Sequence, residues 1–322
     1  MSVLSDELSD TDGISVGHPG KSFPVEIIIS FDSLGHVYFV ICDKSMMPLS
    51  WAQIFANLAE IWRGCCGELI FIKKTGKKMI IIPDVHGRTF WRQAVNDYLG
   101  KEHILFLGDY LDPYAYEGIK SAGAYKVFHE IIGLKKDNPD VITLLLGNHD
   151  LHYLNSDMEG GRMDYTRRDR IIKDITDNAN LFRIADLATI GGKKYLFTHA
   201  GVKKEWIQGH QEALGNPNPV EIADRLNTLW LDLSQRPKLL NMLADVPYSR
   251  WGNSPYGSPV WNDVSDMFDT DEDFPELVQV FGHTQQMSKP VIRAHYMCLD
   301  VRCAFRLSEE NSTPVAITER TL

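Results

Sequence analysis

A carboxylate and an imidazole stand two residues apart in the stretch MIIIPDVHGRTF, residues 79–90, directly after a run of apolar residues. Together, Asp84 and His86 could hold a metal ion, because carboxylate oxygens and imidazole nitrogens are common ligands of transition metals. An ordinary turn between a strand and a helix would use the same residues, with Asp84 accepting hydrogen bonds and Gly87 relaxing the backbone. From this stretch alone, the turn and the metal site are both open interpretations.

Polar side chains of the same kinds follow four further apolar segments. They are Asp109 and Asp112 after HILFLG, Asn148 and His149 after VITLLLG, His199 after KKYLFT, and His283 after LVQVFG. Taken singly, each could serve only a turn or a helix cap. Because ligands bind at the carboxyl ends of strands in open α/β sheets, the repetition at five strand ends favours one shared site. Five other histidines are expected to be bonded within their own turns, namely His103, His129, His152, His210 and His295.

The donor types at these strand ends are chemically specific. Carboxylate, imidazole and amide oxygen suit manganese, iron and zinc, and cysteine thiolates are absent from the set. Six donors are too many for one tetrahedral ion with an open position, and they suit two ions that share a bridging carboxylate. The six are Asp84, His86, Asp109, Asn148, His199 and His283. We therefore expect a centre of two divalent or trivalent transition-metal ions.

The elements that must position these residues can also be read from the sequence. From Lys78 onward, nearly continuous apolar strands alternate with amphipathic helices, which predicts an α/β sheet covered on both sides. Helix-rich stretches near residues 151–190 and 202–275 interrupt this alternation, and we expect them to be insertions that wall the substrate site. Residues 21–76 predict a small α+β segment, and residues 1–20 a flexible acidic tail.

Composition excludes several classes of protein. The formal net charge of −10 argues against a general nucleic-acid binder, because phosphate backbones are held mainly by Lys and Arg. No apolar run approaches the ~20 residues that span a bilayer, so no membrane partner is expected. The five cysteines form no CxxC pair, which favours reduced thiols and a cytoplasmic location. Nothing in the sequence indicates an oligomeric state.

Five motifs occur in an order that resembles a known family. Asp-x-His-Gly, Gly-Asp-x-x-Asp, Gly-Asn-His-Asp, His-Ala-Gly and Gly-His-Thr are similar to the motifs of the calcineurin-like metallophosphoesterase superfamily. The resemblance covers about Lys78 to Leu307, and Gln285 after Gly-His-Thr resembles the protein-phosphatase and diadenosine-tetraphosphatase branch. It implies that residues 77–322 form a β-sandwich flanked by helices, in four layers (α/β/β/α).

The resemblance also implies the reaction and the role of each residue. The reaction is phosphoester hydrolysis, with a water or hydroxide that bridges the two metals as the nucleophile. The implied ligands are Asp84 and His86 for the first metal, Asp109 for both, and Asn148, His199 and His283 for the second. His149 would act as the general acid at the leaving group, and Asp112 would orient its ring.

The pattern departs from the protein phosphatases at the phosphate grip. Those enzymes continue Gly-Asp-x-x-Asp with an arginine that holds the substrate phosphate, whereas here Pro113 follows Asp112. Arg88 and Arg250 are candidates to replace it, and a cluster at residues 167–170 reads as surface charge. The Gly-Asn-His-Asp motif ends in aspartate instead of the usual glutamate. Both departures weaken an assignment as a protein serine/threonine phosphatase.

We therefore expect an enzyme, a phosphatase acting on small molecules or phosphoproteins. A dinucleoside-polyphosphate hydrolase and a phosphodiesterase are the alternatives within the same chemistry. A non-catalytic scaffold with the same fold is less favoured, because His149 and all six donors are present. The acidity of the chain disfavours a nuclease.

Overall fold

The computed structural model describes residues 78–158, 161–267 and 274–319, and the backbone of three strands that precede them. Those strands are β1 (Ile27–Phe31), β2 (Val37–Ile41) and β3 (Ile70–Ile72). β2 pairs with β1 antiparallel and with β3 parallel. The chain divides into two compact units, Met1–Thr75 and Gly76–Leu322. The acidic tail at residues 1–20 and the helix expected within residues 21–76 lie outside the described residues.

The larger unit, Gly76–Leu322, contains a six-stranded sheet with the strand order β14-β13-β4-β5-β6-β7. Its strands are β4 (Met79–Ile82), β5 (His103–Phe106), β6 (Ile142–Leu145), β7 (Phe182–Arg183), β13 (Phe305–Leu307) and β14 (Val315–Ala316). β4 to β7 run parallel, whereas β13 is antiparallel to β4. Parallel strands end at the same edge of a sheet, so the turns after β4, β5 and β6 lie together.

The larger unit also contains a five-stranded sheet with the strand order β11-β12-β10-β9-β8. Its strands are β8 (Ala185–Ile190), β9 (Lys193–Thr198), β10 (Leu277–Phe281), β11 (Val291–Ile292) and β12 (Tyr296–Cys298). β8 and β9 form a hairpin around Gly191 and Gly192, whose positive φ angles of 56° and 77° match a tight two-residue turn. β9 and β10 run parallel, so the turns after them also share one edge.

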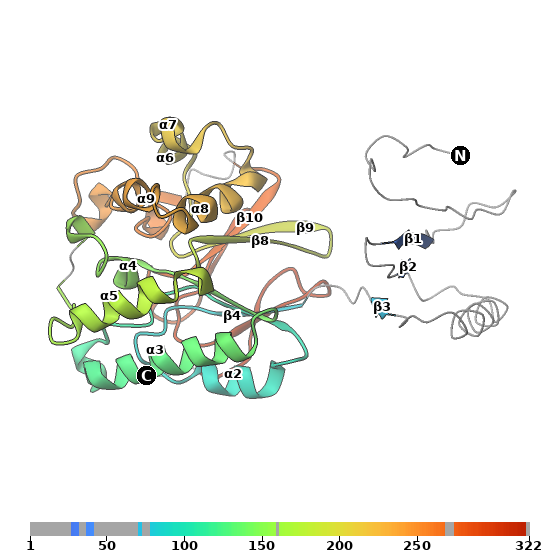
Figure 1. Cartoon of the computed structure of the whole chain (residues 1–322), viewed down its shortest axis with the longest axis horizontal. Coiled ribbons are helices and arrows are strands. Elements are labelled where there is room, and N and C mark those ends of the chain that lie inside the picture. The colour runs from blue at the N-terminus through green and yellow to red at the C-terminus, as the bar shows by residue number, and fades with distance from the viewer. Residues whose placement is uncertain are drawn as a thin grey trace, which may run out of the picture. The chain divides into compact units, whose positions relative to one another are not determined.

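Two groups of helices cover the outer faces of the sheets (Figure 1). One group is α2 (Trp91–Tyr98), α3 (Ser121–Asp137) and α5 (Arg168–Asp177), while the short α4 (Asn148–Leu151) follows β6 at the strand ends. The other is α6 (Lys204–Gly209), α7 (Gln211–Leu214), α8 (Ile222–Leu231) and α9 (Arg236–Leu243). Short 3₁₀ helices lie at residues 115–117, 156–158, 179–181, 219–221, 248–250 and 264–267.

Apolar spacing explains why these helices pack where they do. α3 buries Ala124, Val127, Phe128, Ile131 and Ile132, which recur every three or four residues and so form one stripe along the helix. That stripe packs over the six-stranded sheet, and α8 packs over the five-stranded sheet.

The strands read as continuous apolar runs because both of their faces are buried. Ile81 of β4 is buried between the two sheets together with Phe197 of β9. The neighbouring Ile80 faces the other way and belongs to the same buried cluster as Phe128 of α3. Two sheets with helices on both outer sides confirm the four-layer α/β/β/α architecture that the family resemblance implies. In the part of the chain that the structure describes, no helix has both the length and the apolar character to cross a membrane.

Candidate metal centre

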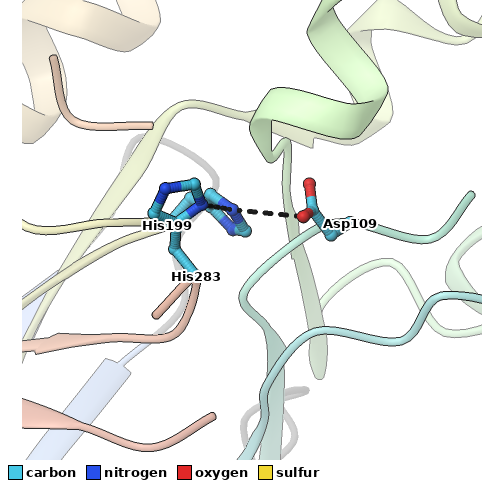
Figure 2. A group of neighbouring side chains, drawn as sticks. All are labelled: Asp109, His199 and His283. Atoms are coloured by element: carbon cyan, nitrogen blue, oxygen red, sulfur yellow. Dashed lines mark hydrogen bonds and ion pairs between the residues drawn. The ribbon is translucent and has the colours of Figure 1, made fainter. Parts of the chain in front are cut away.

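The turns that follow strands of both sheets bring the candidate side chains to one place. Asp84, Asp109 and Asn148 come from the turns after β4, β5 and β6, while His199 and His283 come from the turns after β9 and β10. Figure 2 shows Asp109 opposite His199 and His283. All five side chains are buried. The site therefore lies between the two sheets, at the edge where their parallel strands end.

The backbone is strained where it carries several of these residues. His86, Asp109, Asp112 and His283 have positive φ angles of 45°, 53°, 57° and 62°. For residues with a side chain, this left-handed conformation costs about 1–2 kcal/mol each. Such strain persists only where surrounding structure enforces it, and it is common at functional sites.

The two carboxylate oxygens of Asp109 contact different groups. Oδ1 accepts a hydrogen bond from the backbone N–H of His149 at 2.9 Å, which fixes the carboxylate. Oδ2 lies 3.4 Å from Nε2 of His86 and also 3.4 Å from Nε2 of His199. Asp109 therefore belongs to two groups of ligand-type atoms, one with Asp84 and His86 and one with His199 and His283.

Backbone carbonyls orient two of the imidazoles toward these groups. Nδ1 of His86 faces the carbonyl of Leu111 at 2.8 Å, and Nδ1 of His199 faces the carbonyl of Leu107 at 2.8 Å. A carbonyl only accepts, so each Nδ1 carries a proton, and Nε2 points into the cluster. This is the arrangement by which proteins aim histidines at metal ions.

The electrostatics of the cluster favour a positive charge at its centre. Burial lowers the pKa of His86 and of His283 well below the usual value, so both rings are neutral and keep a lone pair. Burial would also lower the pKa of His199, but the carboxylates of Asp109 and Asp84 raise it to about 10. Burial raises the pKa of Asp84. Burial would also raise the pKa of Asp109, but the neighbouring histidines, His199 foremost, together outweigh it and hold this pKa well below the usual value.

The donor set fits metal ions on an independent observation. Nε2 of His199 and Nδ1 of His283 each lie 3.0 Å from the side-chain oxygen of Asn148, which can only accept. Nε2 of His199 and Nδ1 of His283 also lie 3.2 Å from each other, so three ligand-type atoms converge on one point that a metal cation could occupy. Nε2 of His283 is also buried without a hydrogen-bond partner among the described residues. Oxygen and imidazole donors in this number suit manganese, iron or zinc.

Glycines allow the strand ends to approach this closely. A side chain at Gly147 would collide with Oδ1 of Asp109 and would meet Cε1 of His199 at 2.7 Å. A side chain at Gly282 would collide with Oδ1 of Asp84. Both positions lie directly before a candidate ligand, so they set the distance between the turns.

Asp150 joins two of the turns, and the sequence did not indicate this. Its fully buried carboxylate accepts hydrogen bonds from the backbone N–H groups of Asp109, Tyr110 and Gly147 at 2.8–3.0 Å. The aspartate thereby ties the turn after β5 to the turn after β6. The only sequence signal was the change from glutamate to aspartate at the end of the Gly-Asn-His-Asp motif.

His149 is positioned by a carboxylate that several groups hold. Its Nδ1 lies 2.9 Å from Oδ2 of Asp112, while Tyr153 donates its hydroxyl to Oδ1 of Asp112 at 2.5 Å. Nε2 of His152 lies 2.6 Å from Oδ2 of Asp112. Burial would raise the pKa of Asp112, but the hydrogen bonds of His149 and His152 lower it. His152 thus contacts Asp112, not merely its own turn as expected.

The two arginines expected near the phosphate are both paired. Arg88, which is 3% exposed, donates to Glu117 through Nε and Nη2 at 2.9 Å and to the carbonyl of Asp84. Nη2 of Arg250 donates to Thr284 at 2.9 Å, and its Nε lies 2.7 Å from Asp263. As phosphate ligands, both stay predictions.

A third arginine, Arg162, reaches the site without any sequence signal. Its Nη2 lies 2.7 Å from Nε2 of His149, and its guanidinium carbon lies 3.7 Å from the ring centroid of Tyr114. Nη1 is buried and has no hydrogen-bond partner among the described residues. Arg162 lies in the helix-rich stretch after β6, where no motif marks it.

The family model of the calcineurin-like phosphoesterases matches residues 77–287, which is most of the chain and includes all six candidate ligands. This chain belongs to the calcineurin-like phosphoesterase family. The resemblance seen in the five motifs is thereby confirmed. The protein is a metal-dependent phosphoesterase, and the family assignment accounts for the cluster of ligand-type residues between its sheets.

Similar solved structures share low identity with the chain. The cold-active protein-tyrosine phosphatase of the psychrophile Shewanella sp. is 17% identical, with a TM-score of 0.46 and coverage of 97% of this chain and 99% of that chain. Another structure of a cold-active protein tyrosine phosphatase is also 17% identical, with a TM-score of 0.41 and coverage of 95% of this chain and 97% of that chain. The phosphatase domain of the Legionella effector WipB is 14% identical, with a TM-score of 0.27 and coverage of 48% of this chain and 57% of that chain. A comparison with curated proteins found no match.

Proposed function

We propose that this calcineurin-like phosphoesterase is a phosphatase that uses two transition-metal ions to hydrolyse phosphoesters of small molecules or phosphoproteins. The observation that carries the proposal is the sharing of Asp109 between two groups of donor atoms. One carboxylate in reach of two groups is what a pair of ions with a common ligand requires.

The proposed ligands follow from these two groups. We assign Asp84 and His86 to the first ion, Asp109 to both, and Asn148, His199 and His283 to the second. Manganese, iron and zinc all suit these donors, and six ligands of this kind leave open positions for substrate. Bound there, the ions would supply positive charge to the phosphoryl oxygens and would activate the attacking water.

His149 is the proposed general acid. Its Nδ1 is bonded to the carboxylate of Asp112, so Nε2 is the atom that would face the leaving group. Tyr153 holds the other oxygen of Asp112 and thereby keeps the ring of His149 in one orientation. Asp112 is a positioning residue in this scheme, because it acts through the imidazole.

We also propose that residues 77–322 form the catalytic domain and that its two helix-rich stretches wall the site. Contacts from both stretches support this. From residues 151–190, Arg162 contacts His149, and from residues 202–275, Arg250 contacts Thr284 beside His283. A cytoplasmic location and the absence of general nucleic-acid binding stay predictions.

The proposed function is tested by metal analysis combined with a panel of phosphoesters. Wild-type protein is expected to bind two equivalents of manganese and to hydrolyse phosphomonoesters. Asp84→Asn is expected to lose one equivalent and to lower kcat/KM by at least about 100-fold, since even groups that only support metal ligands contribute 10–100-fold. Asp97→Asn, a change of the same kind at an exposed position of α2, should behave as wild type.

The panel includes p-nitrophenyl phosphate, its bis-ester and a dinucleoside polyphosphate. Faster hydrolysis of the bis-ester than of the monoester would indicate a phosphodiesterase instead. Faster hydrolysis of the dinucleoside polyphosphate would indicate a polyphosphate hydrolase. Unchanged metal content and turnover in Asp84→Asn would remove the ligand assignment itself.

A further inference from the structure

The guanidinium group of Arg162 has one paired and one unpaired amino group. Nη2 lies 2.7 Å from Nε2 of His149, whereas Nη1 is buried without a hydrogen-bond partner among the described residues. A buried donor without an acceptor is unfavourable, and more so when it is part of a charged group. The position of Nη1 therefore calls for an acceptor, and an anion would suit it best.

The contact between Arg162 and His149 is incompatible with the proposed proton transfer. Nδ1 of His149 donates to the carboxylate of Asp112, and a guanidinium can only donate. Nε2 of His149 must therefore accept from Arg162, and in this arrangement it has no proton to give. For His149 to protonate a leaving group, Arg162 has to move from Nε2 to another partner.

Tyr114 holds the guanidinium beside the metal ligands. The guanidinium carbon of Arg162 lies 3.7 Å from the centroid of the Tyr114 ring, a distance at which cation and ring attract each other. The same ring meets His86 edge-on, with centroids 5.1 Å apart. The cation is therefore supported close to the groups that would bind the phosphoryl oxygens, without being fixed by a salt bridge.

Charge pairing separates Arg162 from the other arginines near the site. Arg88 pairs with Glu117, which Arg302 also contacts at 3.5 Å, and Arg250 lies against Asp263. Among the residues that the structure describes, no carboxylate pairs with Arg162. Of the three described arginines Arg88, Arg162 and Arg250, Arg162 is thus the one without a carboxylate partner, and its positive charge is available for a substrate.

We propose that Arg162 binds the phosphoryl group of the substrate and releases His149 when it does so. A planar guanidinium can donate two parallel hydrogen bonds to two phosphate oxygens, which would engage the unpaired Nη1. This inference rests on the proposed function, because it takes the phosphoester as the ligand of the metal centre.

The test is the binding of inorganic phosphate to manganese-loaded protein, measured by calorimetry, together with steady-state kinetics on p-nitrophenyl phosphate. Arg162→Gln is expected to weaken phosphate binding by about 10- to 100-fold and to raise KM in parallel, as expected for losing a charge-assisted hydrogen bond. Arg162→Lys should recover part of the affinity, because it keeps the charge without the fork. Arg92→Gln, on the surface of α2, is the matched control and should not differ from wild type.

Two outcomes would overturn the inference. Wild-type phosphate affinity in Arg162→Gln with a lowered kcat would mean that Arg162 acts only through His149. A wild-type protein that binds no phosphate would have no phosphate site for Arg162 to serve. Metal content and circular dichroism of each variant show whether it is folded and loaded, and Arg162→Lys replaces Arg162→Gln if the latter is not.

The same measurements separate this inference from the proposed function. Wild-type protein that binds phosphate through Arg162 but hydrolyses no phosphoester would contradict the function alone. Hydrolysis by wild type with unchanged phosphate affinity in both Arg162 variants would contradict the inference alone.

Discussion

His149 illustrates how much of this site is decided by single contacts. Its two ring nitrogens face different partners, Asp112 on one side and Arg162 on the other. The first contact fixes the orientation of the ring, and the second occupies the atom that would transfer the proton.

The acid role of His149 predicts a dependence on the leaving group. His149→Ala should lower kcat on an alkyl phosphate by about 10²–10⁴, because an alkoxide needs a proton as it departs. The same change should affect p-nitrophenyl phosphate much less, since nitrophenolate leaves without one. Steady-state kinetics on both substrates measure the difference.

His129→Ala is the control, because this histidine lies on the surface and is bonded to Asp174. An equal loss on both substrates in His149→Ala would assign His149 a structural role instead.

Single residues also show where sequence reasoning stops. The six donors and His149 could be found because each follows an apolar run, and the same pattern recurs at five strand ends. Asp150 and Arg162 could not, since their roles depend on contacts through space. Arg162 meets His149 from thirteen residues along the chain, with no periodic or motif signal to connect them.

At the scale of elements, Gly147 and Gly282 set the distance between the turns at the strand ends. The strands themselves were predictable, because burial on both faces gives apolar runs such as MIII and ITLL. The family resemblance implied a second sheet, but nothing in the residues of β9 and β10 assigned these strands to it. Strands of two residues, β7, β11 and β14, are too short to leave a periodic signal.

The close approach at Gly282 predicts a variant with a damaged metal site. Gly282→Ala would push its new Cβ onto Oδ1 of Asp84, so manganese affinity should fall by roughly 10–100-fold, as for other groups that position ligands. Calorimetric titration of metal-free protein with manganese measures this.

Gly133→Ala in α3 is the matched control, because a Cβ at this position would have no neighbouring atom within 4 Å outside its own helix backbone. There the same change should leave metal affinity alone and raise stability by about 0.5–1 kcal/mol, since alanine favours a helix. Equal metal affinities in the two variants would contradict the role given to Gly282.

At the scale of the whole molecule, metal binding and the stability of the fold are expected to be coupled. Five carboxyl groups are buried in the larger unit near the cluster, on Asp84, Asp109, Asp112, Asp150 and Asp300. Burial raises the pKa of Asp300 well above the usual value, and the charge of Asp84 adds to this effect. Cations at the cluster would offset the repulsion among these groups, so the folded chain should depend on metal for part of its stability.

Metal removal should therefore lower the melting temperature. At a free manganese concentration about 1,000 times Kd, binding adds roughly 4 kcal/mol to the free energy of unfolding. For a unit of this size, that corresponds to a shift of roughly 10 °C. Calorimetry with and without a chelator measures it, with Asp97→Asn as a control that keeps the shift and Asp84→Asn as the variant that loses most of it. A melting temperature indifferent to chelation would show that the cluster is stable without cations.

The left-handed residues at the strand ends have a consequence for engineering this protein. At His86, Asp109, Asp112 and His283, the residue that the backbone would favour is glycine, while the proposed chemistry needs a ligand or an orienting carboxylate. Selection for heat resistance alone would push these four positions toward glycine and discard the site. Stabilising substitutions belong on the outer helices instead, where the most stable residue and the useful one can be the same.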